Sequence, residues 1–511
     1  MTLRFEPTPF AEKAVLDFRP LASRLKRAVD PRLKSACSAS GRAAENLELL
    51  FSGDVLCVTT GQQPGLFTGP LYTVYKALTA AAAAQILSER LRTPVVPVFW
   101  VAGDDHDFAE ANHTYLLTVA NEIERLTLRV RSPEAPLTPL YRETLGAEVE
   151  ELLERITELT PATEFRPAVL EWLGRHYRPE SDLAGAFSGA LAELLAEFGV
   201  VVFRPTDREA KRAMVPFFIR QLEMAPELDR ALAEHRDLLR SRGLDTPIEV
   251  GDGASTVMLE CRLGRDRLIL EDGHYVARRG GERWSLDELI GLVEREPERF
   301  SPNVLARPVI EAALFPTLAY VAGPAEYAYL RQCEPLYRVL GVERQTPIAR
   351  WSGRVVEKRV AKVLEKYGIG AEDLRLPEGQ LEAQLVRDEM PEQARAALNQ
   401  LRAVLEREYG RLAEAVKEID PTLVKPVESA RNEALVASRE LEKKIVHHLK
   451  QKNEILVSQL AKARNNLFPL GKPQERVLNV IPYLVRYGRE FLGEAFAACK
   501  THALATLGGD P

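Results

Sequence analysis

Near its start the chain carries two runs of apolar residues, 55–58 and 94–102, of the kind typical of parallel strands buried on both faces of a sheet. Between them lie a glycine-containing segment, 59–70, and an alanine-rich helical pattern over 71–91. A strand, a helix and a second strand in this order predict a right-handed βαβ unit. Ligands of open α/β sheets bind beside the carboxyl ends of the strands, so the sequences TTGQQPG and GDDHD mark a candidate site.

A later strand, turn and helix predict that the same sheet continues in the second half of the chain. The pattern has a short apolar strand at 318–321, a turn, and a helix over 325–340 whose first turn accommodates a proline. Glu326 and Tyr329 would then lie near the amino end of the helix. We therefore expect them at the same edge of the sheet as the two earlier sequences.

The intervening residues predict one more α/β unit and an inserted sheet. A buried strand at 200–203 precedes a helix that Thr206 or Asp207 can cap. Residues 246–282 form short alternating segments separated by glycine-containing turns, which indicates a small antiparallel sheet. Residues 285–288 match a capping box, which predicts the start of a further helix.

The C-terminal third has the heptad pattern of a coiled coil. Apolar residues recur every seven positions at Leu398, Leu405, Leu412 and Ile419. Pro421 and Pro426 interrupt this pattern, and a second apolar stripe follows over residues 441–467. The two stripes predict an antiparallel helical hairpin, or alternatively a pair of ordinary core helices. Because a projecting hairpin with an apolar stripe needs a partner, we predict a homodimer.

Together these patterns predict an α/β fold with a Rossmann-like parallel-sheet core, inserted subdomains and a C-terminal antiparallel coiled-coil hairpin. The expected divisions are a first core part over 1–130, connecting insertions over 131–300, a second core part over 301–370 and a helical coiled-coil domain over 371–511.

Composition limits the classes of function. The chain has 511 residues and a net charge of −6, which argues against nucleic acid as a partner. Its five cysteines are scattered without metal-finger spacing, which indicates thiols in a reducing compartment. There is no run of eighteen apolar residues and no apolar core of a signal peptide, so we expect a cytoplasmic protein without a membrane segment.

The glycine-containing segment lacks both common nucleotide motifs, because Gly61, Gly65 and Gly69 form neither GxGxxG nor a GK[ST] loop. A loop that leads into a helix N-terminus still offers backbone N–H groups to a phosphate or carboxylate. A plain strand-to-helix crossover is the alternative. Side-chain donors beyond the needs of a crossover favour a binding site: Gln62, Gln63 and Thr68.

The GDDHD sequence gathers aspartates around His106, an arrangement that like-charge repulsion makes costly for stability alone. If a helix begins here, His106, Glu110 and His113 share one face and could ligate a metal. Helix caps and solvated charges are the alternative. The aspartates concerned are Asp104, Asp105 and Asp107.

Four sequences carry a resemblance to the BshC family of bacillithiol biosynthesis over essentially the whole chain: TGQQPGLFTGPLYT, PVVPVFWVAGDDHDFAEANH, SPNVLARPVIEAALFPTLAYVAGPAEYAY and NLFPLGKPQERVLN. The resemblance implies a Rossmann-like core with insertions, a coiled coil that mediates dimerisation, and addition of cysteine to glucosaminyl-malate. More distantly, the first strand, loop and helix resemble those of the HIGH-motif nucleotidyltransferases. Tyr72 and Tyr75 stand approximately where the two signature histidines would be.

An amide-forming ligase needs an activated carboxylate and a neutral amine. We expect ATP with magnesium to activate the carboxylate, although no ATP-specific motif is present, and we expect no tightly bound metal. His106, or a carboxylate beside it, is the expected general base, and Asp105 or Asp107 could orient the imidazole or hold the amine of a substrate. The expected substrate-binding residues are Gly61, Gln62, Gln63, Thr68, Gly69, Tyr72, Asp104, Asn303, Arg307, Glu326 and Tyr329.

Two alternatives from other classes remain. A metal-dependent hydrolase or amidase would use the GDDHD cluster, and stoichiometric zinc or manganese would support it. A non-catalytic ligand-binding protein would act through its helical hairpin, and ligand-induced stabilisation without turnover would support that function.

Overall fold

The computed structural model describes residues 3–10, 17–388 and 390–508. Its central sheet has the strand order β14-β13-β3-β4-β7-β2. Neighbouring strands are parallel except for the last pair, β7 and β2, which confirms the predicted parallel core. The strands are β2 (Cys37–Ser38), β3 (Leu56–Gln62), β4 (Val95–Val101), β7 (Val201–Phe203), β13 (Thr317–Ala322) and β14 (Thr346–Ala349).

The βαβ unit at the centre of the sheet forms as predicted. Helix α3 (Leu71–Leu91) connects β3 to β4, and the two strands pair in parallel from Leu56 with Val95 to Gln62 with Val101. The strands are almost fully buried, which accounts for their uninterrupted apolar sequence. Polar groups inside them are satisfied; the hydroxyl of Thr60, for example, donates to Val321 O at 2.8 Å.

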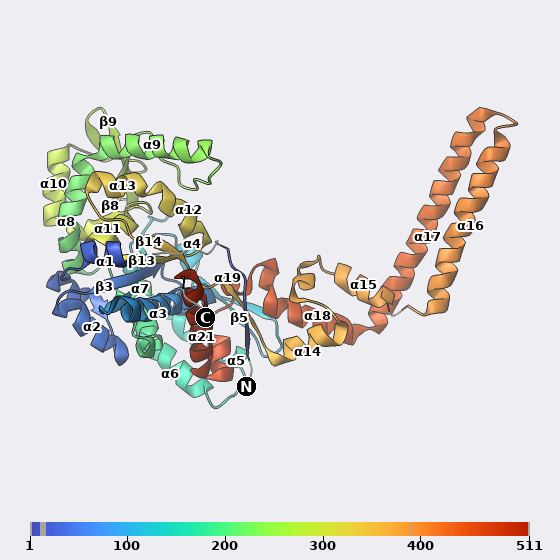
Figure 1. Cartoon of the computed structure of the whole chain (residues 1–511), viewed down its shortest axis with the longest axis horizontal. Helices are drawn as coiled ribbons and strands as arrows, with labels where there is room; N and C mark the ends of the chain where they lie inside the picture. The colour runs from blue at the N-terminus through green and yellow to red at the C-terminus, as the bar shows by residue number, and fades with distance from the viewer. Residues whose placement is uncertain (1–2, 11–16, 389, 509–511) are drawn as a thin grey trace. The chain divides into compact units, whose positions relative to one another are not determined.

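Helices cover both faces of this sheet (Figure 1). On one face, Leu56 and Val58 of β3 pack in a cluster with α3 and with α21 (Glu490–Thr506). On the other, Cys57 packs in a cluster with α8 (Arg208–Glu223) and α11 (Arg307–Leu314), which contribute Ala210, Met214, Phe218, Ile310 and Leu314. Alternate residues of β3 thus pack against the helices on opposite faces of the sheet, because successive side chains of a strand point to opposite faces.

Gly61 lies where β3 approaches the backbone of β4. A Cβ atom at this position would lie 2.8 Å from the carbonyl oxygen of Trp100. We predict that Gly61→Ala lowers the free energy of unfolding by about 1–3 kcal/mol because the strands must separate. Gly174→Ala in α6 (Arg166–His176) is the matched control, since nothing lies within 4 Å of its Cβ position. That control should stabilise the chain by about 0.5–1 kcal/mol in a urea titration; equal effects of the two substitutions would contradict this explanation.

An antiparallel sheet is inserted between the parts of the core, in the order β11-β10-β9-β8-β12, and confirms the predicted insertion. The capping box at Ser285 and Glu288 is also present, at the start of α10 (Leu286–Arg295). The strands are β8 (Ala254–Cys261), β9 (Gly264–Glu271), β10 (His274–Ala277), β11 (Arg283–Trp284) and β12 (Phe300–Pro302).

The helix expected over residues 325–340 is two helices, α12 (Pro324–Gln332) and α13 (Glu334–Leu340). Pro335 explains the break, because proline lacks the N–H that would continue the first helix and its ring clashes with the preceding turn. The prediction of one continuous helix was therefore wrong. The start of α12 still carries Glu326 to the predicted edge of the sheet.

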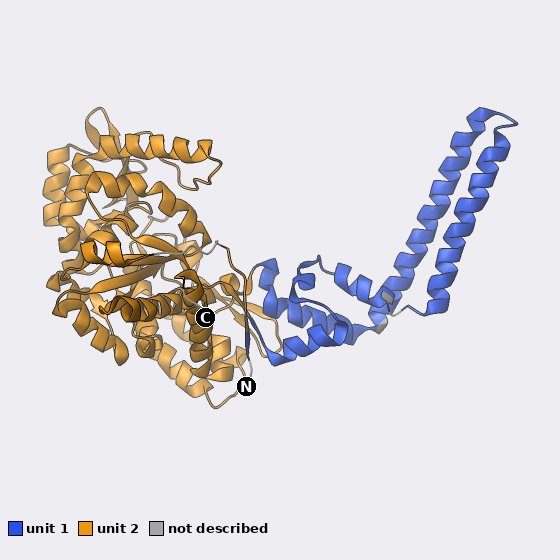
Figure 2. Cartoon of the chain, in the orientation of Figure 1, with its two compact units in different colours: residues 1–4, 355–472 blue, residues 5–354, 473–511 orange. Residues whose placement is uncertain are grey.

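The chain forms two compact units (Figure 2): residues 1–4 with 355–472, and residues 5–354 with 473–511. The predicted helical domain began at 371 and ran to the C-terminus, whereas residues 473–511 group with the core. The reason is packing: Ala503 and Leu507 lie in one apolar cluster with Ala80 and Ala83 of α3.

The unit formed by residues 355–472 contains the predicted antiparallel hairpin, made by α16 (Glu392–Val416) and α17 (Val424–Lys452) (Figure 1). Ile419, expected as the last heptad position, lies beyond the end of α16. The second predicted helix is divided at Asn453, after which α18 (Glu454–Leu467) begins. In the described part of the chain, none of the helices combines the length and apolar content needed to cross a bilayer.

Candidate active site

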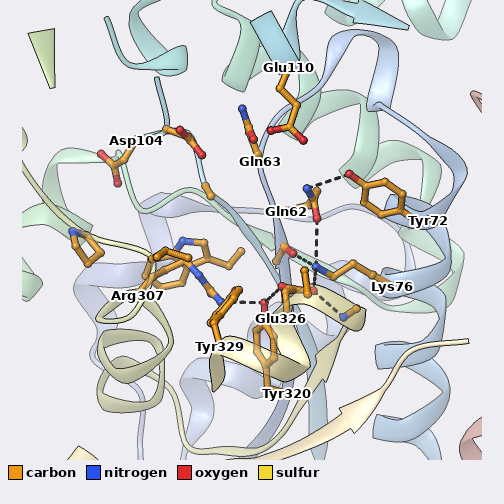
Figure 3. Close-up of a pocket in the computed structure, with 18 of the residues that line it drawn as sticks. Gln62, Gln63, Tyr72, Lys76, Asp104, Glu110, Arg307, Tyr320, Glu326 and Tyr329 are labelled. Atoms are coloured by element: carbon orange, nitrogen blue, oxygen red, sulfur yellow. Dashed lines mark hydrogen bonds and ion pairs between the residues drawn. The ribbon is translucent and has the colours of Figure 1, made fainter. Parts of the chain in front are cut away.

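A cavity of about 340 Å³ lies at the carboxyl ends of β3, β4 and β13, where the sequence places its polar segments. Figure 3 shows side chains from these strand ends converging on it. The cavity therefore brings together segments that are far apart in the sequence. The predicted residues among its lining are Gly61, Gln62, Gln63, Tyr72, Asp104, Asp105, Asn303, Arg307, Glu326 and Tyr329.

Thr68 and Gly69 do not line this cavity, and the protein itself uses backbone groups of their loop. Thr68 is fully buried, and its backbone N–H donates to the hydroxyl of Tyr177 at 2.8 Å. The carbonyl of Gly69 accepts from the side chain of Asn479 at 3.0 Å. The N–H of Leu71, at the start of α3, donates to Leu478 O at 2.9 Å. A protein segment thus occupies the helix N-terminus that was expected to hold an anion.

The GDDHD segment forms a turn followed by one short helix, α4 (Phe108–Ala111). Asp107 caps this helix and lies outside the cavity lining; its Oδ1 accepts from the N–H of Glu110 at 3.0 Å. The helix ends at Ala111 because β5 (His113–Leu117) pairs with β6 (Ile123–Thr127). His106, Glu110 and His113 therefore do not share a helix face, and that prediction was wrong. No group of three or more potential metal ligands occurs among the described His, Cys, Asp and Glu residues.

His106 lies beside the cavity rather than in its lining. Its Nδ1 is 3.3 Å from Nη1 of Arg265, a guanidinium nitrogen that can only donate, so Nδ1 accepts and the neutral ring carries its hydrogen on Nε2. Burial lowers the pKa of His106, and the charge of Arg265 lowers it further. The imidazole is thus neutral, with its accepting nitrogen already engaged. Asp105, which does line the cavity, accepts from the backbone N–H of His106 at 2.7 Å.

Asp104 is paired with a buried cation. Its Oδ1 lies 2.6 Å from Nζ of Lys211, which is fully buried and also donates to Phe300 O at 2.6 Å. The charge of Asp104 is therefore compensated from within the protein, and Lys211 holds β12 against α8 at the same time. Asp104 is a fixed wall of the cavity.

Glu110 differs from Asp104 in having no ion-pair partner within the described parts of the chain. It lines the cavity, and Figure 3 shows its carboxylate near Gln63. Burial raises the pKa of Glu110, and the neighbouring carboxylates of Asp107 and Asp105 raise it further. A carboxylate with a raised pKa in a cavity has the properties of a general base.

A network of buried charges forms the floor of the cavity. Lys76 pairs with Glu326 at 2.6 Å, and Glu326 also accepts from the hydroxyl of Tyr320 at 2.7 Å. Arg307 donates to this hydroxyl and to Glu311, each at 2.9 Å. Both terminal nitrogens of Arg307 thus bind protein oxygens. Its guanidinium is therefore fixed in the floor and is not available to bind a ligand carboxylate in a bidentate manner. Burial alone would raise the pKa of Glu326, but the contact with Lys76 leaves that pKa lowered.

Asn303 has a divided role. Its Oδ1 accepts from the backbone N–H groups of Leu305 and Ala306 at 3.0 and 2.9 Å, which caps the turn before α11. The amide nitrogen of Asn303 is the group left to donate to a ligand. Tyr329 completes this wall as a buried phenol, and burial raises its pKa.

Three arginines in the lining were not predicted: Arg265, which contacts His106, and Arg350 and Arg476. Arg350 forms a buried, bidentate pair with Glu475, with distances of 2.9 and 2.6 Å. Arg476 is exposed and has no ion-pair partner among the residues described. The guanidinium carbons of Arg350 and Arg476 lie 5.6 and 6.0 Å from the ring centre of Tyr72. Two cations therefore lie close to the tyrosine ring at the cavity wall.

The sequence offers a signal for only some of the missed residues. Lys76 is the one charged residue between 71 and 87, within a helix that is buried on nearly all sides, and such an isolated charge indicates a buried partner. Arg350 and Arg476 precede and follow the helical unit in the chain, so no local pattern joins them. Arg265 comes from the inserted sheet and likewise carries no motif.

Comparisons with known proteins agree with this architecture. A family model described as "Bacillithiol biosynthesis BshC, N-terminal Rossmann-like domain" matches residues 13–350, and one described as "Bacillithiol biosynthesis BshC, C-terminal coiled-coil domain" matches residues 354–505. Two similar curated proteins both bear the name "Putative cysteine ligase BshC". The protein from Salinibacter ruber is 33% identical over 91% of this chain and 84% of its own length. That from Heliobacterium modesticaldum is 34% identical over 89% and 83%.

Proposed function

This chain belongs to the BshC family of bacillithiol biosynthesis, and on that premise we propose that it is a ligase joining L-cysteine to glucosaminyl-malate through an amide bond. The observation that carries the proposal is the cavity at the carboxyl ends of β3, β4 and β13. It combines an unpaired carboxylate, Glu110, an unpaired cation, Arg476, and amide donors within the described chain. These groups suit a reaction between an amine and a carboxylate.

The chemistry assigns roles to the chain's own groups. The sugar nitrogen attacks the carboxyl carbon of cysteine, the C–N bond forms, one C–O bond breaks, and the nitrogen loses a proton. We assign that proton to a group in residues 104–110, and the geometry favours Glu110 over His106 because Nδ1 of His106 already accepts from Arg265. Asp105 and Asp107 then act by shaping the turn that presents Glu110.

Anion recognition is assigned to other groups of the cavity lining. Arg476 can bind a malate carboxylate through paired N–H groups, because none of the described acids holds it. The amide groups of Asn303 and Gln63 add neutral donors in the same lining. Arg307 stabilises the floor of the cavity and does not bind the malate carboxylate directly.

ATP with magnesium is the proposed activator. The donor set fits a magnesium-bound phosphate, since Arg476 offers an unpaired cation among the described residues and Asp105 offers a carboxylate in the same lining. When bound, ATP would supply the leaving group that a free carboxylate lacks.

The experiment that tests the proposal is an incubation of the pure chain with L-cysteine and glucosaminyl-malate, with and without ATP and magnesium. We expect the amide product only in the complete mixture, together with AMP or ADP, as measured by mass spectrometry and nucleotide chromatography. Cleavage of either reactant without condensation would favour a hydrolase and contradict the proposal.

We also propose that the chain forms a homodimer through its helical hairpin. Leu412 of α16 and Leu441 of α17 are each 48% exposed, so the hairpin leaves large apolar side chains available to a partner. Light scattering should give twice the chain mass, and Leu412→Glu with Leu441→Glu should give the single mass. Leu470→Glu, at a residue 55% exposed outside the hairpin, is the control and should remain dimeric. A single-chain mass for the unaltered protein at micromolar concentration would contradict the proposal.

The proposed compartment is the cytoplasm. All five cysteines are free in the structure, and those at positions 57, 333 and 499 are buried. Free buried thiols are typical of proteins that work in a reducing environment.

A further inference from the structure

We propose that the hydroxyl of Tyr72 donates a hydrogen bond to the reacting carboxyl group of cysteine, and that Gln62 and Lys76 fix the direction of its hydrogen. The inference rests on the proposed function and deepens it. It comes from a line of contacts that runs from the cavity floor through Lys76 and Gln62 to Tyr72 (Figure 3). Tyr72 would be a catalytic residue, and Gln62 and Lys76 positioning residues.

Lys76 is the first determinant. Its ammonium group has three acceptors: the backbone carbonyl of Gly61, Oε1 of Gln62 at 3.2 Å and a carboxylate oxygen of Glu326 at 2.6 Å. The side chain is only 1% exposed, so water cannot replace them. An ammonium has three hydrogens and no lone pair. All three hydrogens are therefore used, and Lys76 must face the oxygen end of the Gln62 amide.

The contact with Lys76 fixes the orientation of the Gln62 side-chain amide. An amide side chain has an oxygen that accepts and a nitrogen that donates, and their assignment normally follows from the surrounding hydrogen bonds. Because the oxygen faces Lys76, the nitrogen of Gln62 must donate to the hydroxyl oxygen of Tyr72, which lies 3.2 Å away. The polarity of the contact between Gln62 and Tyr72 is thus determined by a buried ammonium.

The hydrogen of the Tyr72 hydroxyl is then available for donation to a ligand. Its oxygen accepts from Gln62, so the hydrogen points away from that amide. No protein acceptor for it occurs among the described residues, and Tyr72 lines the cavity. Tyr75, one turn later on α3, is fully buried and does not line the cavity. Of these two tyrosines, Tyr72 is the one that can offer its hydrogen to a ligand.

The surroundings of Tyr72 favour an anionic oxygen as the acceptor. The guanidinium carbons of Arg350 and Arg476 lie within 6.0 Å of its ring centre, so two positive charges lie close to the tyrosine ring. Burial raises the pKa of Tyr72 to about 12, so the hydroxyl keeps its hydrogen at neutral pH. When an amine adds to a carboxyl carbon, the carbonyl oxygen gains negative charge, and a fixed donor next to it stabilises that charge.

Glu326 secures the start of the line of contacts. Its carboxylate accepts from Lys76, from the hydroxyl of Tyr320 and from the backbone N–H of Gly323 at 2.7 Å. These bonds tie Lys76 to the first turn of α12. The direction of the Tyr72 hydroxyl is therefore set by rigid elements of the core and not by a loop.

The first test is Tyr72→Phe, which keeps the ring close to the two arginines and removes only the hydroxyl. We expect kcat/KM for cysteine to fall by about 10²-fold, the effect of losing one donor to a developing anion. The dissociation constant of L-cysteine, from calorimetric titration of the full chain, should rise about tenfold. An unchanged thermal unfolding midpoint would show that the fold is intact. Kinetic and binding constants equal to those of the unaltered chain would overturn the inference.

The second test reverses the polarity of the line. In Gln62→Glu both side-chain oxygens accept; one still pairs with Lys76, and the other draws the hydrogen of Tyr72 out of the cavity. We expect the loss seen in Tyr72→Phe, and no further loss when both substitutions are combined. Full activity of Gln62→Glu, or effects that multiply in the double variant, would overturn the inference.

Gln63→Glu is the matched control for the added charge. Gln63 lines the same cavity but donates to the carbonyl of Asp107 at 3.0 Å instead of to Tyr72. Its effect should multiply with that of Tyr72→Phe, because the two act independently. If Gln63→Glu also caused no further loss when combined with Tyr72→Phe, the added charge alone would explain the effect of Gln62→Glu.

The binding measurement separates the two levels of the proposal. If the unaltered chain binds L-cysteine but forms no amide, the proposed function fails, while the dissociation constants of the Tyr72 and Gln62 variants still decide the inference. If the unaltered chain forms the amide and the variants behave like it, the inference fails alone. Absence of cysteine binding by an active-site-intact chain would overturn both.

Discussion

Replacing Glu110 with glutamine is expected to lower kcat for amide formation by about 10²–10⁴-fold, because the variant keeps the side-chain shape and cannot accept a proton. Glu110 lines the cavity and forms no ion pair among the described residues, although the charge of Arg476 acts against the rise of its pKa. The measurement is steady-state product formation at saturating cysteine. Glu122→Gln, an exposed carboxylate in the loop before β6, is the control and should leave kcat unchanged.

The pH dependence of the unaltered chain gives a second readout of Glu110. A carboxylate acts as a base only when it is deprotonated, so kcat/KM should fall as the pH decreases through the pKa of Glu110. Burial and the neighbouring Asp107 and Asp105 raise that pKa, so the fall should begin above the usual glutamate value of about 4.3. Glu110→Gln should remove this acid limb. If Glu110→Gln kept both the rate and the fall of kcat/KM at low pH, another group would be the general base.

Replacing Glu475 with alanine is expected to lower the free energy of unfolding by about 3–5 kcal/mol. The substitution leaves Arg350 as a buried cation without its partner; the side chains of Arg350 and Glu475 are 2% and 4% exposed. Glu475 also accepts from the hydroxyl of Ser352 at 2.7 Å and from the N–H of Gly353 at 3.1 Å, so four donors lose one carboxylate. Activity should fall too, since Arg350 lies beside Tyr72.

Glu171→Ala is the matched control for Glu475→Ala. Glu171 pairs with Arg175 at 2.8 Å, but the two side chains are 74% and 46% exposed. Solvent weakens such a pair, so the loss should be below about 0.5 kcal/mol. Urea titrations of both variants measure the contrast. Similar losses in the two variants would show that burial does not govern the strength of the Arg350–Glu475 pair.

The central part of the fold follows directly from the sequence because its signals are local. The apolar runs around 55–58 and 94–102 lie in β3 and β4, and the alanine-rich pattern matches α3 over Leu71–Leu91. Strand periodicity and glycine turns likewise identify the inserted sheet. These features were predictable because the spacing of apolar residues within each element shows which of its faces is buried.

Other features depend on contacts that no local pattern contains. The helix expected after GDDHD is cut short because residues 113–117 find a strand partner in 123–127. The GDDHD segment drew attention to His106, yet the inserted sheet contributes Arg265, which engages its Nδ1. Arg476 reaches the cavity from beyond the helical unit. Sequence patterns thus locate the edge of the site, whereas tertiary contacts decide which side chains face the ligand.

The central claim is that the chain condenses an activated cysteine carboxylate with the amine of glucosaminyl-malate, and oxygen-18 in that carboxylate tests it most directly. Labelled cysteine, glucosaminyl-malate, ATP and magnesium are incubated with the pure chain, and all products are analysed by mass spectrometry. The account predicts an amide product that retains one labelled oxygen and a phosphate-containing product that carries the other. An absence of amide, with both labelled oxygens remaining on free cysteine, would contradict it.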